Sequence, residues 1–317
     1  MIDTVDHALP HGITLHCRVS GEAGRPVLMF LHGFPEGAFI WDGLLAHFSR
    51  PEHGGWRCVA PNLRGFGPSS SPADAQAYRA KHLVQDVVAL IAAECGAGQP
   101  LAALVAHDWG GAVAWNVANQ RPELLQRLLI VNSPHPGAFV RELQNNPAQQ
   151  AASDYMRFLC RPDAEALLAE NDFARMFGFF NTPGGGGAPD WLTPAVREQY
   201  RRQWRQGLTG PCNYYRASPL RPPGSDDPGA AAVQLPPGML TVRVPTQVLW
   251  GLNDPALLPG LLEGLGDWVP DLRVQPLPAA SHWVVHEQPE AVAAALTSLL
   301  SRQQSASNAI DSIASGA

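Results

Sequence analysis

Short apolar runs alternate with stretches of helical spacing along most of the chain. The apolar runs lie at residues 27–31, 57–60, 101–106, 128–131, 246–250 and 272–276. The helical stretches lie at residues 41–48, 81–93, 112–118 and 290–300. Near-continuous apolar strands that alternate with helices are typical of a parallel sheet covered on both faces. The chain is therefore predicted to have an α/β fold with a mostly parallel central sheet, preceded by an amino-terminal hairpin around residues 8–19.

Residues 137–237 interrupt this alternation. They are rich in helix formers and aromatic residues, and they include a Gly run at 184–187 and a Pro/Gly-rich stretch at 219–237, both predicted to be loops. We interpret this segment as a helical cap, with helices at 148–160, 164–176 and 193–206. It is inserted between core residues 1–136 and 238–301. The Ser- and Ala-rich tail at 302–317 is predicted to be disordered.

Composition excludes several classes of function. The formal charge is −6 without a basic cluster, so neither nucleic acid nor an anionic membrane is an expected partner. The five cysteines are scattered without metal-ligand spacing, which favours reduced thiols and no metal site. The first residues lack the features of a signal peptide, and no run reaches the roughly 20 apolar residues of a membrane span. A cytoplasmic protein without membrane insertion is expected.

The most informative segment is Val105-Ala-His-Asp-Trp-Gly-Gly111, between a predicted strand and a predicted helix. A sharp strand-to-helix turn with small residues around one reactive side chain is the arrangement of a nucleophile elbow. The reactive position is usually serine, but here it is Asp108. A carboxylate attacks a saturated carbon and forms an alkyl ester, whereas serine forms acyl esters. The alternative is a buried aspartate that caps the following helix.

A nucleophile needs a base and a group that orients the base. His282 follows the last predicted strand, and Asp254 follows the strand at 246–250. Taken alone, His282 could be structural and Asp254 could belong to a turn before Pro255. The order Asp108, Asp254, His282 is nevertheless the order of a catalytic triad in the α/β-hydrolase fold, and open α/β sheets place their sites at these strand ends.

The backbone after the strand at 27–31 supplies a second candidate feature. In this fold the segment Leu31-His-Gly-Phe-Pro-Glu36 is the expected source of an oxyanion-hole amide. The N–H groups of Phe34 and Trp109 are then predicted to point at one oxygen of Asp108. A plain Gly-Pro turn is the alternative. Arg64, in the loop at 61–69, is interpreted as structural.

Five segments together resemble the epoxide hydrolases of the α/β-hydrolase fold, in the branch that also contains haloalkane dehalogenases. They are His32-Gly-Phe-Pro-Glu36, Pro61-Asn-Leu-Arg-Gly-Phe-Gly-Pro-Ser69, His107-Asp-Trp-Gly-Gly111, Trp250-Gly-Leu-Asn-Asp254 and Ser281-His282. The resemblance spans about residues 10–300. It implies a cis peptide between Phe34 and Pro35. Relatives often have Asp where Asn62 stands, which is expected to alter loop hydrogen bonding but not chemistry.

The same resemblance assigns two cap tyrosines that hydrogen-bond the epoxide oxygen. Tyr155, seven residues before Pro162-Asp-Ala-Glu165, matches one, and Tyr215 in Asn213-Tyr-Tyr-Arg216 matches the other, with Tyr214 packed beside it. The alternative for each is an aromatic residue of the cap core. Haloalkane dehalogenases typically have Asn at the position of Phe34, and haloacetate dehalogenases typically carry arginines after the nucleophile, which this chain lacks.

The resemblance implies an epoxide hydrolase that needs no metal or organic cofactor. Asp108 would form the ester, and His282, oriented by Asp254, would activate the water that hydrolyses it. The aromatic cap favours a small apolar epoxide as the substrate, in a monomer or a homodimer. A dehalogenase, an ester hydrolase and a non-catalytic ligand receptor are the alternatives. The residues expected to contact the substrate are Phe34, Trp109, Phe158, Phe177 and Trp283.

Overall fold

The structure is a computed structural model that describes residues 1–181, 187–225 and 227–314, with side chains as far as residue 302. Its strands are β1 Asp3–Ala8, β2 Thr14–Ser20, β3 Val27–Leu31, β4 Arg57–Pro61, β5 Ala103–His107, β6 Leu128–Val131, β7 Thr246–Gly251 and β8 Leu272–Leu277. Its helices are α1 Asp42–Phe48, α2 Ala80–Cys95, α3 Asp108–Gln120, α4 Pro136–Asn145, α5 Pro147–Ala152, α6 Tyr155–Cys160, α7 Ala164–Gly178, α8 Pro194–Trp204, α9 Thr209–Ala217, α10 Val284–Glu287 and α11 Pro289–Ala314.

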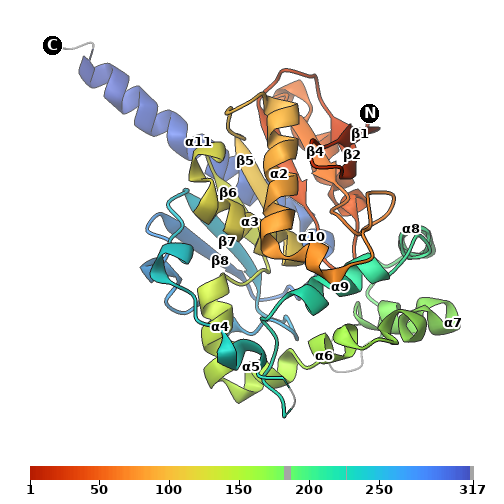
Figure 1. The fold of residues 1–317 in the computed structure, drawn as a ribbon. Coiled ribbons are helices and arrows are strands. Elements are labelled where there is room, and N and C mark those ends of the chain that lie inside the picture. The colour runs from red at the N-terminus through yellow and green to blue at the C-terminus, as the bar shows by residue number, and fades with distance from the viewer. Residues whose placement is uncertain (182–186, 226, 315–317) are drawn as a thin grey trace.

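A single twisted sheet of eight strands forms the centre of the molecule (Figure 1). The strand order is β1-β2-β4-β3-β5-β6-β7-β8, and every pair from β4 onward is parallel, while β2 pairs antiparallel with β1 and β4. The predicted hairpin and the predominantly parallel sheet are both confirmed. Parallel strands bring the residues that follow β3, β5, β6, β7 and β8 to one edge of the sheet.

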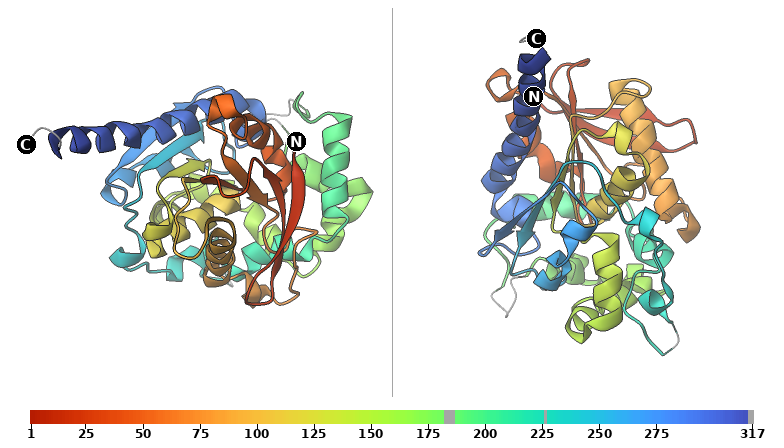
Figure 2. Two further views of the ribbon diagram at one scale, coloured as in Figure 1. Left: turned by 90° about the horizontal axis from the view of Figure 1, so that it is seen from above. Right: turned by 90° about the vertical axis from the view of Figure 1, so that its left-hand side faces the viewer.

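The sheet is buried because its strands are apolar on both faces. In β5, Leu104 and Ala106 belong to one core cluster, while Ala103 and Val105 belong to the other. Helices α2 and α3 cover the first face, and α1 and α11 cover the second. Figure 2 shows the helices on opposite sides of the strands. The sheet is therefore a rigid support for side chains at its edge.

The segment between β6 and β7 forms a helical cap over the carboxyl ends of the strands (Figure 1). Helices α4 to α9 occupy it, close to the three helical stretches that the sequence predicted. The helix α7 is interrupted at residues 170–173, where the backbone leaves the helical region. Of the Gly run predicted to be a loop, residues 184–186 lie outside the described residues.

The carboxyl-terminal helix α11 begins at Pro289 and packs against the sheet through its first turns. It extends to Ala314 and projects away from the body of the molecule (Figures 1 and 2). The disorder predicted from residue 302 stays a prediction. Residues 315–317 lie outside the described residues.

Candidate active site

Asp108 stands at the sharp turn between β5 and α3. Its φ of 49° lies in the left-handed region, which a non-glycine residue adopts only where its surroundings impose it. The neighbouring chain leaves no room for side chains. A Cβ on Gly110 would lie 2.5 Å from the Leu31 carbonyl oxygen, and one on Gly33 would lie 2.2 Å from Oδ1 of Asp108. Glycine is required at both positions because the backbone passes so close.

Two backbone amides contact the Asp108 carboxylate. The Phe34 N–H donates to Oδ1 at 2.7 Å, and the Trp109 N–H also hydrogen-bonds the carboxylate. The bond between Phe34 and Pro35 is cis, as the resemblance implied. Burial raises the pKa of Asp108, while the positive charges of His282 and His107 and the two amides lower it, and the net result is a raised pKa. The two amides are fixed dipoles that favour negative charge on the carboxylate and offset part of the effect of burial.

The predicted base and its orienting acid lie beside Asp108. His282 Nδ1 is 2.6 Å from Oδ2 of Asp254, and its Nε2 is 3.7 Å from Oδ2 of Asp108. Asp254 is buried and also accepts hydrogen bonds from Asn132 Nδ2 at 2.8 Å and from the amides of Ala256 and Leu257. These bonds fix the Asp254 carboxylate, and this carboxylate fixes the His282 ring with Nε2 toward Asp108.

The charges around His282 favour its protonated form. Burial lowers the pKa of His282, but the negative charge and hydrogen bond of Asp254, together with the charge of Asp108, raise it to about 9. With both neighbouring carboxylates ionised, the ring therefore carries a proton at neutral pH. Asp108 is one of the groups that hold this proton, so the pKa of His282 depends on the state of the nucleophile.

The cap brings Tyr155 and Tyr215 together, although they lie at opposite ends of the insertion. Tyr155 is the first residue of α6 and Tyr215 is in α9, and their ring centroids are 6.0 Å apart. Burial raises the pKa of both phenols well above the ordinary value, and the negative charge of Asp108 adds to this. Both therefore keep the proton that a donor needs. Tyr214 turns away, and its hydroxyl donates to the Arg64 carbonyl at 2.8 Å.

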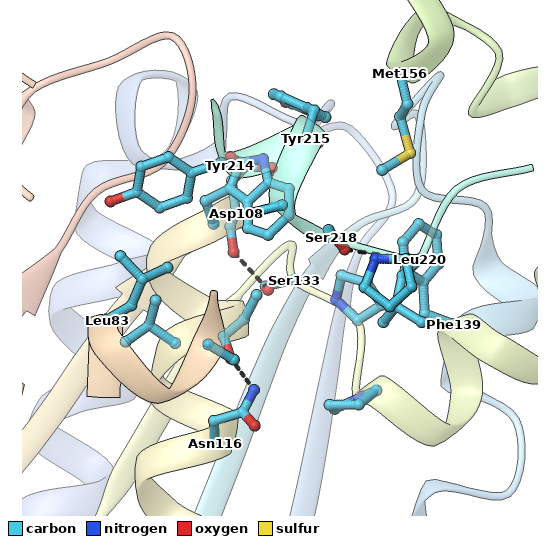
Figure 3. A pocket seen from close by; sticks show the side chains of 18 of the residues that line it. Leu83, Asp108, Asn116, Ser133, Phe139, Met156, Tyr214, Tyr215, Ser218 and Leu220 are labelled. Atoms are coloured by element: carbon cyan, nitrogen blue, oxygen red, sulfur yellow. Dashed lines mark hydrogen bonds between the residues drawn. The ribbon is translucent and has the colours of Figure 1, made fainter. Parts of the chain in front are cut away.

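Two cavities meet at Asp108 and the tyrosine pair. The first, of about 240 Å³, is lined by Asp108, Trp109, Tyr155 and Tyr215 and by apolar side chains of α3 and of the segment after α9 (Figure 3). The second, of about 280 Å³, is lined by Asp108 and both tyrosines and also by Phe34, Pro35, Phe179, His282 and Trp283. The Asp108 side chain keeps 14% of its surface accessible. Both cavities thus reach Asp108.

The aromatic residues of the cap only partly follow the sequence prediction. Phe34, Trp109 and Trp283 line the cavities at Asp108, but Phe158 and Phe177 line neither. Phe177 packs on Trp204, with ring centroids 4.8 Å apart, and Phe158 packs under the Arg175 guanidinium. An aromatic pattern does not distinguish the core of a cap from the wall of a cavity. Phe179, which sequence reasoning missed, lines the second cavity instead.

A buried polar network behind the site also escaped sequence analysis. Glu36 is fully buried, and its carboxylate contacts His107 Nδ1 at 3.0 Å, His286 Nε2 at 2.7 Å and the Tyr200 hydroxyl at 2.8 Å. His107 Nε2 in turn lies 2.9 Å from the His282 carbonyl oxygen. Burial alone would raise the pKa of Glu36, but its histidine partners hold it well below its ordinary value. The network joins the cap to the backbone of the base.

The remaining sequence expectations concern loops. Arg64 forms a buried bidentate ion pair with Asp86, at 2.6 and 2.7 Å, as expected for a structural residue. Asn62 accepts the Ala38 amide at 2.8 Å, a loop hydrogen bond remote from the reacting groups. Among the described residues, no group of three or more His, Cys, Asp or Glu side chains could hold a metal ion. In the same part of the chain no helix is long and apolar enough to cross a membrane.

Comparison with known proteins identifies the family. The chain matches the alpha/beta hydrolase fold family over residues 26–289. The AB hydrolase superfamily protein YfhM of Bacillus subtilis (strain 168) is 33% identical over 285 residues, which cover 89% of this chain and 92% of the relative. Human epoxide hydrolase 4 is 32% identical over 287 residues, which cover 89% of this chain and 74% of the relative.

A solved structure agrees with these relatives. An epoxide hydrolase of the α/β hydrolase superfamily from metagenomes of hot environments superposes with a TM-score of 0.83 and 37% identity, over 95% of this chain and 99% of that chain. The chain therefore belongs to the epoxide hydrolases of the α/β-hydrolase fold, and it is a hydrolase.

Proposed function

We propose that this enzyme converts apolar epoxides into vicinal diols through a covalent ester on Asp108. The observation that supports this most strongly is that two protonated phenols, Tyr155 and Tyr215, line both cavities together with the nucleophile. Opening of an epoxide leaves negative charge on its oxygen, and a donor that protonates this oxygen in the transition state lowers the barrier. A halide leaving group needs no such proton.

In the first step, Oδ2 of Asp108 attacks one epoxide carbon, and the bond from that carbon to the oxygen breaks. The oxygen takes its proton from Tyr155 or Tyr215. Oδ1 accepts the Phe34 amide, whereas Oδ2 lies 3.7 Å from His282 Nε2, so we assign the attack to Oδ2. The product of this step is an alkyl ester whose carbonyl oxygen is Oδ1.

Before the second step, the phenolate left by the first step takes the proton of His282 and becomes a phenol again. His282 then takes a proton from water, and the hydroxide attacks the carboxyl carbon of Asp108. Negative charge develops on Oδ1, beside the amides of Phe34 and Trp109. Collapse of this intermediate breaks the ester bond, and the departing alkoxide takes the proton from His282. The proton left on the Asp108 carboxyl passes to His282, which restores the resting charges of the site. Because alkylation neutralises Asp108, the pKa of His282 falls when it must act as a base.

Purified enzyme assayed with a panel of epoxides and haloalkanes tests this proposal. We expect diol release from epoxides and no halide release. Tyr155→Phe and Tyr215→Phe should each lower kcat/KM for epoxides at least about tenfold, and the double variant by about 10³ or more, because general acid catalysis contributes roughly 10²–10⁴.

Tyr200→Phe is the matched control, since it removes another buried cap hydroxyl that lies outside both cavities. It should change kcat/KM by no more than about threefold. Full epoxide activity in the Tyr155/Tyr215 double variant, or halide release in place of diol, would reject the proposal and favour a dehalogenase. Tight ligand retention without any turnover would favour a receptor.

A further inference from the structure

The first cavity follows the face of α3 that begins at the nucleophile. Trp109, Ala112, Val113 and Asn116 line it, and their spacing places them on one face of the helix. Over the eight residues from Asp108 to Asn116 a helix advances about 12 Å. Figure 3 shows Asp108 and Asn116 well separated along this helix. We call this part of the cavity the α3 arm.

The α3 arm is mainly apolar, and the polar Asn116 donates its side-chain amide to the Ala112 carbonyl at 2.9 Å. Val233 and Leu235, from the segment that joins the cap to β7, contribute to its other walls. Among the described residues that line the cavity, Asp108 is the only charged side chain. Binding of a substrate in the arm is therefore favoured by burial of its hydrocarbon surface and not by interactions between charges.

The wall of the arm reaches the protein surface at the end away from Asp108. Asn119, just beyond Asn116 on α3, donates hydrogen bonds to the carbonyls of Gly238 at 3.0 Å and Thr241 at 2.8 Å. These bonds hold the segment around Met239 against this end of the helix. Met239 lines the cavity and is 51% exposed. The apolar wall thus ends at the protein surface and not at a closed base.

We propose that the α3 arm selects epoxides with a long hydrocarbon substituent and lets the end of a longer chain emerge past Met239. This inference rests on the proposed function. An extended chain advances about 1.3 Å per carbon, as C–C bonds of about 1.5 Å dictate, so about nine carbons fill the arm. Carbons up to that length become buried, and further carbons stay in water.

The test is a series of terminal 1,2-epoxyalkanes with side chains of two to fourteen carbons. The value of kcat/KM should rise roughly threefold to fourfold per carbon up to about nine carbons and then level off. A terminal hydroxyl on the chain should cost at least about tenfold when the chain ends inside the arm, and less than about twofold when it ends beyond Met239. The binding affinity of the matching 1,2-alkanediols, measured by calorimetry, should also rise up to about nine carbons and then level off. We call this change of slope the break, and the calorimetric measurement of it requires no turnover.

Ala112→Phe places a ring across the middle of the arm and should move the break to about four or five carbons. Gln120→Phe is the control, because it adds the same ring to an exposed position of the same helix, outside the cavity, and should leave the break unchanged. A flat dependence on chain length, or a fall beyond a short optimum, would overturn the open arm while leaving epoxide hydrolysis intact. Diol binding with the expected break, in a protein that turns over no epoxide, would instead reject the proposed function alone.

Discussion

At the scale of single residues, the site depends on a few side chains held in specific states. Asp108 is in a left-handed conformation, which costs about 1–3 kcal/mol and is imposed by the packing of the elbow. The Ser133 hydroxyl donates to the Asp108 carbonyl at 2.7 Å and thereby secures the strained turn. His282 lies between two carboxylates, with Nδ1 2.6 Å from Asp254 and Nε2 3.7 Å from Asp108. Its titration therefore reports directly on the charge of the nucleophile.

We expect the imidazole of His282 to titrate near the pKa of about 9 that its surroundings impose, and not near 6.5. In Asp108→Ala the pKa should fall, because a negative charge that favours the protonated ring is removed. NMR titration of the ring measures both values, and loss of the resonance in His282→Ala assigns it. In the ester, where Asp108 is neutral, the pKa of His282 should accordingly be lower than 9. The neutral imidazole that acts as the base in ester hydrolysis should therefore form below pH 9. A wild-type value at or below 6.5, or one unaffected by Asp108→Ala, would contradict this electrostatic account.

At the scale of elements, the cap is fastened to the core through the carboxylate of Glu36. Tyr200 of α8 donates to Glu36 at 2.8 Å, and both side chains are fully buried. Sequence analysis anticipated a cap and its helices from their composition. It did not anticipate this contact, because Glu36 and Tyr200 are 164 residues apart and no local sequence pattern around either residue indicates a contact between them. The same limitation explains the misplacement of Phe158 and Phe177.

Removing the Tyr200 hydroxyl should destabilise the protein measurably. Tyr200→Phe deletes a hydrogen bond to a buried carboxylate, worth about 2 kcal/mol, and should lower the melting temperature by roughly 3 °C for a chain of this size. Arg202→Ala, on the exposed face of the same helix, is the control and should shift melting by less than about 1 °C. Differential scanning calorimetry measures both variants. An unchanged melting temperature in Tyr200→Phe would mean that this contact does not fasten the cap.

At the scale of the whole molecule, the fold brings distant strand ends and both ends of the cap to one place. Asp108, Asp254 and His282 could be predicted because each follows a recognisable strand, and parallel strands end at one edge of the sheet. Tyr155 and Tyr215 could be predicted only through resemblance, because composition does not fix how a cap closes. The cavities and their aromatic walls required the structure, since they depend on helix rotation and on the irregular segment before β7.

The central claim, an ester on Asp108, is tested most directly by a single turnover in heavy-oxygen water with the enzyme in excess. If water attacks the carboxyl carbon of the ester, the label enters the Asp108 side chain, and the first diol released contains none. Mass spectrometry of the peptide that contains Asp108 and of the diol measures both. Label in the first diol with an unlabelled Asp108 would contradict the account, because water would then have attacked the epoxide itself and Asp108 would have acted as a base.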